Sequence, residues 1–154
     1  MRRVLFLFFA GTILFAVSGC AVQPEQAAAP APTFRLVTGI HEVMEGLVAP
    51  AADTVWKSVG TIITEQGIEE RRPKDDIEWE IVEHAALGVA ESGNLLLLEG
   101  RALDHDDWVK FTHDMMDKAE AASKLALAKD ADGLLKAGSD LYETCTACHL
   151  KYIQ

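Results

Sequence analysis

The chain has 154 residues, 49% of them hydrophobic, and a formal net charge of −10 at pH 7. This length has room for one folded domain and not for two. The excess of acidic residues argues against binding to nucleic acid or to anionic lipid, because both require a surplus of Lys and Arg. The same charge is compatible with a small basic protein partner.

Residues 1–20 have the composition of a secretory signal peptide. Two arginines precede an apolar run over residues 4–17, which is short for a membrane span. The run ends in Val17-Ser18-Gly19 followed by Cys20, and this ending is similar to a bacterial lipobox, in which lipids are attached to the cysteine. The alternative is an ordinary signal peptide with an incidental cysteine. Lipids on Cys20 would anchor the protein stably, and Ala21 resembles the residue found in lipoproteins of the outer membrane.

Residues 21–33, AVQPEQAAAPAPT, predict an extended tether between the lipid and a domain at 34–154. They contain three prolines and five alanines and show no apolar periodicity. Loss of residues 1–20 removes two arginines and no acid, which leaves 12 basic and 24 acidic residues and a net charge of −12. We expect a lipid-anchored acidic domain on the periplasmic side of the envelope, with the outer membrane favoured over the inner one.

Four helical patterns fill the domain, and no strand is predicted. The first pattern covers residues 34–63, and Pro50 within it is expected to kink or interrupt the helix. The second opens after Pro73, with Asp75 as its N-cap and Glu78 as the capping-box partner. The face expected to be buried in this second helix carries Ile77, Ile81, Ala85, Gly88, Ser92 and Leu95.

The third helix is expected to begin near Asp104, and the fourth runs from about Asp132 nearly to the chain end. The loops between the four helices, around 66–74, 99–104 and 129–132, are short. Short connections make consecutive helices antiparallel neighbours. The predicted fold class is therefore all-α, as an antiparallel up-down-up-down four-helix bundle. The apolar face of the third helix carries Trp108, Phe111, Met115, Ala119, Ala122 and Ala126.

The fourth helix ends in the sequence ETCTACHLKYIQ, which holds Cys145, Cys148 and His149. A thioredoxin-like pair belongs at a helix N-terminus beside a βαβ unit, and this pair lies at the end of the last helix. Zinc needs three or four protein ligands, and no second Cys/His pair exists here. A redox-active dithiol and a zinc site are therefore both disfavoured. Spacings of four and three place both cysteines on one seam of the helix, with Leu134, Gly138, Leu141 and Tyr152.

Cys-x-x-Cys-His is the attachment sequence of c-type haem. Two thiols about one helical turn apart can add to the two vinyl groups of the porphyrin, and the adjacent His149 can then reach the iron. Export is consistent with this chemistry, because an exported Cys-x-x-Cys without haem would be expected to oxidise. We therefore expect one covalent haem c on Cys145 and Cys148, with His149 as the proximal ligand.

A four-helix bundle with this motif near the end of its last helix resembles the cytochrome c′ and cytochrome c-556 family. The resemblance covers the layout of residues 34–154 and the positions Cys145, Cys148, His149 and Tyr152. In that family the motif continues as His-x-x-Tyr-Arg, and here Ile153 replaces the arginine. The resemblance implies that Tyr152 belongs to the haem pocket. It is also compatible with a homodimer formed through the first two helices.

The occupant of the sixth iron position decides between two functions. Met44 lies on the first helix at a level similar to that of His149, and the resemblance implies a distal residue from this stretch. Ligation by Met44 predicts a one-electron carrier with an unidentified redox partner, and no enzymatic reaction. With an open site Leu47 would line the pocket, and NO or CO would bind. Residues weighed below Met44 as ligands are His41, His113, Met115 and Met116. A haem-free lipoprotein that acts as an interaction module is the third alternative.

Overall fold

The computed structural model describes residues 33–153. Within this part of the chain, the residues from Phe34 onward form one compact unit. The expected signal peptide, Cys20 and residues 21–32 of the expected tether lie outside the described residues, as does Gln154. No helix within residues 33–153 is both long enough and apolar enough to cross a membrane.

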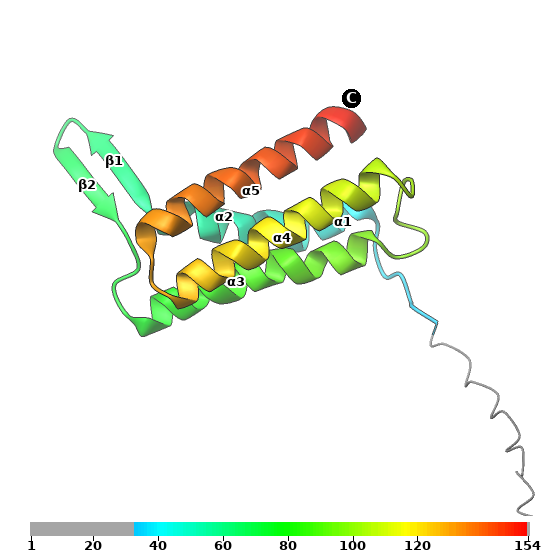
Figure 1. Cartoon of the computed structure of the whole chain (residues 1–154), viewed down its shortest axis with the longest axis horizontal. Helices are drawn as coiled ribbons and strands as arrows, with labels where there is room; N and C mark the ends of the chain where they lie inside the picture. The colour runs from blue at the N-terminus through cyan, green and yellow to red at the C-terminus, as the bar shows by residue number, and fades with distance from the viewer. Residues whose placement is uncertain (1–32, 154) are drawn as a thin grey trace, which may run out of the picture. The chain divides into compact units, whose positions relative to one another are not determined.

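The described chain is predominantly α-helical, as the sequence predicts (Figure 1). A first helical rod consists of α1 (Ile40–Val43), the π-helix η1 (Met44–Val48) and α2 (Ala49–Ser58). Two short strands follow, β1 (Gly60–Thr64) and β2 (Gly67–Arg71). The three remaining helices are α3 (Asp76–Leu96), α4 (Asp107–Leu127) and α5 (Ala131–Tyr152).

The β1–β2 hairpin corrects the prediction that the domain has no strand. The two strands pair antiparallel, from Gly60 opposite Arg71 to Thr64 opposite Gly67. β1 is a run of β-branched residues, which favour extended backbone over helix. Gly60 and Gly67 have φ angles of 144° and 137°, which other residues rarely adopt. Helical spacing through Ile63 is therefore coincidental, and Figure 1 shows the hairpin projecting away from the helices.

Pro50 does not interrupt the first rod, because the helix widens just before it. The amide of Ala49 donates a hydrogen bond to the carbonyl of Met44, five residues earlier. In an α-helix the ring of a proline clashes with the carbonyl four residues before it, and a π turn changes this spacing. The helix is consequently continuous over residues 40–58, although it is shorter at both ends than the expected 34–63.

The N-terminus of α3 has the expected cap. The carboxylate of Asp75 accepts a hydrogen bond from the amide of Glu78 at 2.9 Å. The Glu78 side chain accepts a hydrogen bond from the amide of Lys74 at 2.7 Å. In a standard capping box the Glu78 side chain would bond the amide of Asp75, and here it bonds the amide one residue earlier. The two hydrogen bonds satisfy one backbone donor before the helix and one in its first turn.

We expect Asp75→Ala to lower the free energy of unfolding by about 1 kcal/mol, because it removes the acceptor for the Glu78 amide. Asp75→Asn keeps an acceptor at the same position and should retain most of the stability. Urea unfolding of the three proteins measures both effects. Equal losses in the two variants would contradict a role for this side chain as a cap.

The buried face of α3 differs from the predicted one at most positions, although Ser92 belongs to both. Ile77 and Ile81 are 68% and 54% exposed. The predicted face passes beside Trp79, whose burial removes more apolar area from water than burial of either isoleucine. The face that packs inward carries Trp79, Val82, Ala86, Val89, Ala90, Ser92, Gly93 and Leu96. On α4 the predicted positions are buried except Phe111, which is half-buried.

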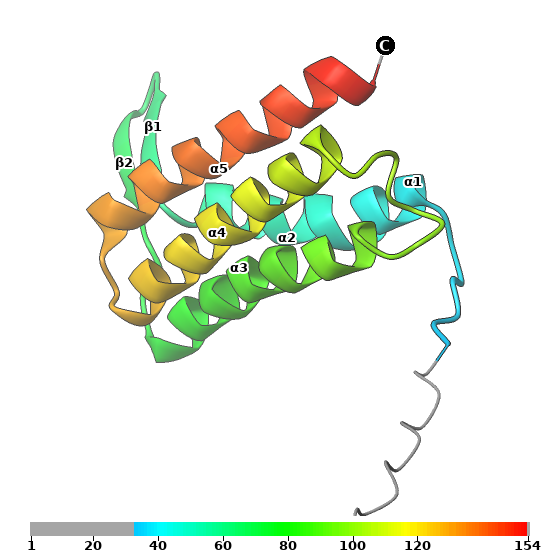
Figure 2. The ribbon, with the colours of Figure 1, turned by 45° about the vertical axis from the view of Figure 1, so that its right-hand side comes forward.

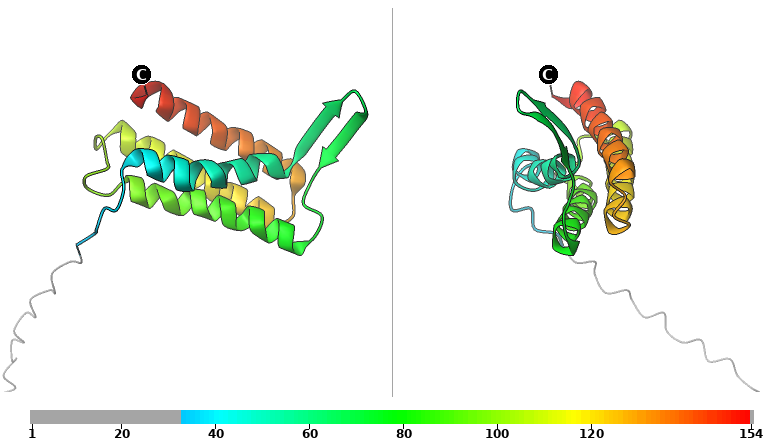
Figure 3. Two further views of the ribbon diagram at one scale, coloured as in Figure 1. Left: turned by 180° about the vertical axis from the view of Figure 1, so that it is seen from behind. Right: turned by 90° about the vertical axis from the view of Figure 1, so that its left-hand side faces the viewer.

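The helices lie side by side, with α4 between α3 and α5 and the first rod against α3 (Figure 2). α2 and α5 approach closely where the indole of Trp56 donates a hydrogen bond to the carbonyl of Gly138 at 2.9 Å. A Cβ at Gly138 would lie only 3.3 Å from the Trp56 ring. Beyond this point α5 diverges from the first rod toward the C-terminus (Figure 3). The divergence opens the space that contains the candidate site.

Candidate functional site

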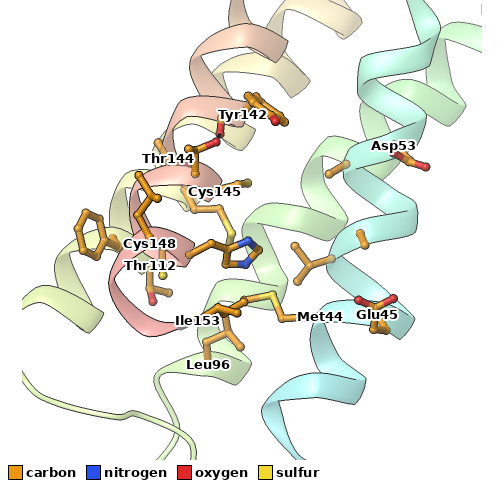
Figure 4. A pocket seen from close by; sticks show the side chains of 18 of the residues that line it. Met44, Glu45, Asp53, Leu96, Thr112, Tyr142, Thr144, Cys145, Cys148 and Ile153 are labelled. Atoms are coloured by element: carbon orange, nitrogen blue, oxygen red, sulfur yellow. Dashed lines mark hydrogen bonds between the residues drawn. The ribbon is translucent and has the colours of Figure 1, made fainter.

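A cavity of about 640 Å³ lies between the first rod, α4 and the C-terminal half of α5. Cofactor and small-molecule sites typically occupy roughly 300–1,000 Å³. The walls of this cavity are largely apolar, and Leu96 at the end of α3 forms part of them. Figure 4 shows Met44, Leu96, Cys145 and Cys148 around this space. The size and the lining fit a large, mostly apolar group.

The α5 wall of the cavity holds the complete Cys-x-x-Cys-His sequence. Cys145, Cys148 and His149 all line the cavity, and both thiols are free. The predicted seam is buried at Leu134, Gly138 and Leu141 and becomes half-buried at the two cysteines. The seam therefore leaves the packed core and faces the cavity at the positions where the motif begins.

The two thiols lack the electrostatics of a redox-active pair. Burial raises the pKa of the Cys145 thiol, although a hydrogen bond with Thr144 partly offsets this effect. Burial also raises the pKa of the Cys148 thiol, and the neighbouring Cys145 adds to the increase. Thiol–disulfide oxidoreductases instead lower a cysteine pKa at a helix N-terminus. Here the pair lies in the C-terminal turns, where the helix dipole disfavours a thiolate.

The opposite wall holds Met44, which is half-buried and lines the cavity from η1. Val48 and Ala49 follow it on the same wall. Leu47, which was expected to line the pocket of an open site, does not line this cavity and is 48% exposed. The π turn explains the difference, because the extra residue in the turn rotates Leu47 away from the face that carries Met44.

Of the other residues weighed as iron ligands, Met115 alone lines the cavity. It is 6% exposed and belongs to the buried cluster around Trp108. His41 and His113 are exposed and lie outside the lining, as does Met116, which lies close to Gly93 of α3. The structure thus brings two methionines, Met44 and Met115, to the same cavity as His149.

Tyr152 lies behind the cavity wall and does not line it. Its ring makes edge contacts with Trp108 and Phe111, at centroid distances of 5.1 and 6.4 Å, and both of these residues line the cavity. Its hydroxyl donates a hydrogen bond to Asp104, which also accepts one from the amide of Trp108 at 2.9 Å. Tyr152 therefore fastens the last turn of α5, next to His149, to the start of α4.

The Asp104–Tyr152 link makes a contribution to stability that depends on pH. The Tyr152 hydroxyl, and then the Trp108 amide, hold the pKa of the Asp104 carboxyl below its ordinary value. Such a carboxylate stabilises the fold above the pKa of the unfolded state, and the contribution disappears as the pH falls through the lower folded-state pKa. We expect Tyr152→Phe to destabilise the protein at pH 7, and the difference from the wild type to shrink below about pH 4.

Urea unfolding from pH 7 downward measures this difference. Tyr142→Phe is the matched control. Tyr142 lies on the same helix as Tyr152, but it packs on Trp56 and does not contact Asp104. A Tyr152→Phe penalty that stays constant down to pH 3 would show that the hydroxyl does not act through the Asp104 carboxylate.

Several residues of the cavity were not singled out in the sequence. Tyr142 lines it one turn before Cys145, and the spacing from the motif could have indicated this position. Thr112 also lines it and is 4% exposed, with its hydroxyl donating to the Trp108 carbonyl at 2.7 Å. Glu45 and Asp53 supply carboxylates from the first rod, and only the fold shows that they reach the site.

Charge at the cavity is acidic. Among the described residues no Lys or Arg lines the cavity. Asp53 is paired with Lys57 at 2.6 Å, and Glu45 is exposed. Ile153 also lines the cavity. Any acidic group on the ligand would therefore have to face solvent at the mouth of the cavity.

Among residues 33–153, no three His, Cys, Asp or Glu side chains gather in the way that would hold a bare metal ion. Comparisons of the chain with protein-family models, with curated proteins and with solved structures give no match.

Proposed function

We propose that this protein is a monohaem c-type cytochrome that transfers single electrons in the bacterial envelope. We also propose that its four helical segments form an antiparallel up-down-up-down bundle, similar to that of cytochrome c-556 and cytochrome c′. One observation carries the proposal: Cys145, Cys148 and His149 line a single, mostly apolar cavity of about 640 Å³.

The donor set of the cavity fits a covalent haem. Each thiol of Cys145 and Cys148 would add across a vinyl group, with the sulfur bonding one carbon and the proton passing to the other. His149 would supply the proximal nitrogen, and Met44 would supply a thioether sulfur from the opposite wall. When bound, the haem provides an iron centre that exchanges one electron. Ligation by His and Met raises its reduction potential.

The buried residues of the inner wall would hold this set in place, whereas His149 and Ile153 are exposed. Trp108 is 3% exposed, lines the cavity and donates its indole N–H to the Leu96 carbonyl at 2.9 Å. Its ring also supports Tyr152, which ties down the turn that carries His149. A packed apolar inner wall favours electron transfer, because little needs to rearrange when the iron changes its charge.

The acidic surface supports a basic redox partner. Without residues 1–20 the chain has a net charge of −12. Glu45 and Asp53 also line the cavity. Complementary charge accelerates encounter between proteins and orients them. Lipids on Cys20 would keep the protein at the membrane, and residues 21–33 would give it reach.

The ferrous absorption spectrum, recorded with and without CO, tests the proposal on protein produced with a haem-attachment system. We expect sharp low-spin bands that CO does not change, because Met44 fills the sixth position. Met44→Leu should give a high-spin spectrum that shifts with CO. Broad bands that respond to CO in the wild type would instead indicate a binder of NO or CO. A protein without haem bands would leave the haem-free interaction module.

A further inference from the structure

We infer that the outer edge of strand β1 pairs antiparallel with the same edge of a second copy of this chain, so that two hairpins join into one four-stranded sheet. No residue of the hairpin lines the candidate haem cavity, so this contact does not depend on the proposed function. It also differs from a homodimer through the first two helices, with which the family resemblance is compatible.

The hairpin lacks a neighbour that would stabilise it. Among residues 33–153 its sheet has two strands, and a two-stranded hairpin alone is at best marginally stable in water. Ile63 and Ile68 lie opposite each other and are 77% and 73% exposed. Because the hairpin projects away from the helices (Figure 1), a further strand can reach its edge. Exposed apolar side chains beside unpaired backbone groups are the features that lead a strand edge to pair.

The register of the hairpin determines which backbone groups of β1 are free. Thr64 lies opposite Gly67 across a two-residue turn, so these two residues exchange hydrogen bonds. Along an antiparallel ladder such pairs alternate, and Ile62 therefore also bonds inward, to β2. The N–H and C=O groups of Thr61 and Ile63 point outward, and none of the described backbone groups outside the hairpin bonds to them.

The charges on the two strands favour β1 over β2 as the pairing edge. β1 has the sequence GTIIT and carries no charge, whereas β2 carries Glu69, Glu70 and Arg71. Charged side chains on an edge strand oppose pairing. Two β2 edges joined around Glu69 would place two carboxylates directly opposite each other, which is destabilising. The uncharged β1 edge lets two copies of an acidic chain meet without this repulsion.

Symmetry then fixes one register for the β1–β1 contact. Thr61 of each copy exchanges hydrogen bonds with Ile63 of the other copy, because these residues carry the outward backbone groups. Ile62 consequently lies opposite Ile62 of the second copy. A contact of β1 with itself closes at two copies, whereas a contact of β1 with β2 would continue into an open chain. The short strands bury little area, so we expect a weak, concentration-dependent dimer.

Oxidation of an Ile62→Cys variant tests the contact by trapping it as a disulfide. Opposite residues without mutual hydrogen bonds have Cα atoms about 4.5 Å apart, which a disulfide can span. We expect a disulfide-linked dimer, and mass spectrometry of the linked peptides should show residue 62 joined to residue 62. Glu69→Cys, at the centre of β2, is the matched control and should stay monomeric. The wild type oxidised in parallel reports any bridge through the native cysteines.

Absence of a bridge in Ile62→Cys, or equal bridging in Glu69→Cys, would overturn the inference. Far-UV circular dichroism shows whether the variants are folded.

A mixture of two exposed variants tests the register without altering Ile62. Thr61→Cys in one copy lies opposite Ile63→Cys in the other, so the mixed proteins should form a disulfide-linked dimer. Each variant alone should link much less, because its own position in the second copy is a diagonal neighbour about 7–8 Å away. A mixture that links no more than its components would contradict the β1–β1 contact.

Discussion

Replacing Cys145 and Cys148 together with alanine is expected to abolish covalent attachment of haem. Both thiols are free and line the same cavity as His149. No other cysteine lies among the described residues, so the double variant leaves the cavity without a group that can form a thioether. Haem staining after denaturing electrophoresis measures the loss, and we expect the signal to fall to background.

The matched control for this experiment is Thr146→Ala. Thr146 lies between the two cysteines on the same turn and lines the cavity, and its hydroxyl donates to the Tyr142 carbonyl. It changes a neighbouring side chain without removing a thiol, so its haem stain should match the wild type. Single replacements of either cysteine should retain haem through one bond. Haem that remains covalently bound in the double variant would refute attachment at this motif.

Leu134→Ala is expected to lower the free energy of unfolding by about 2–5 kcal/mol, the range for deletion of a buried leucine side chain. Leu134 is 0% exposed and belongs to the core cluster with Val55, Trp79 and Ala126, at the end of α5 away from the cysteines. The loss combines removed apolar contact with the cavity that remains, because the surrounding helices cannot close completely. Urea unfolding of the two proteins measures it.

Leu135→Ala is the adjacent control, since Leu135 is 53% exposed and should change stability by less than about 0.5 kcal/mol. The haem spectrum of Leu134→Ala should match the wild type, because Leu134 does not line the cavity. Equal effects of the two replacements would contradict the arrangement of α5. A changed spectrum in Leu134→Ala would show that the two ends of the helix are coupled.

The α5 seam was the part of the site that the sequence predicted best. Leu134, Gly138 and Leu141 are buried as expected, and Cys145 and Cys148 continue their face. The seam could be predicted because a heptad spacing in a long helix reports directly which residues face the neighbouring helices. The cap at Asp75 was also predicted, since it depends only on neighbouring residues.

The errors arose where tertiary packing or backbone geometry determines the result. Leu47 and Tyr152 were both expected in the pocket. The π turn turns Leu47 outward, and Tyr152 instead packs behind Trp108. A sequence period of 3.6 residues contains no information about a local change in helix pitch. The hairpin was missed because the short apolar run at Ile62 and Ile63 fits a strand as well as a helix.

The central claim is that Cys145 and Cys148 carry one haem. The most direct test is the mass of the proteolytic peptide spanning residues 137–151, taken from protein produced with a haem-attachment system. We expect a peptide heavier by one haem, with neither cysteine open to alkylation. A peptide with the mass of its amino acids alone, with both cysteines alkylated or joined in a disulfide, would contradict it.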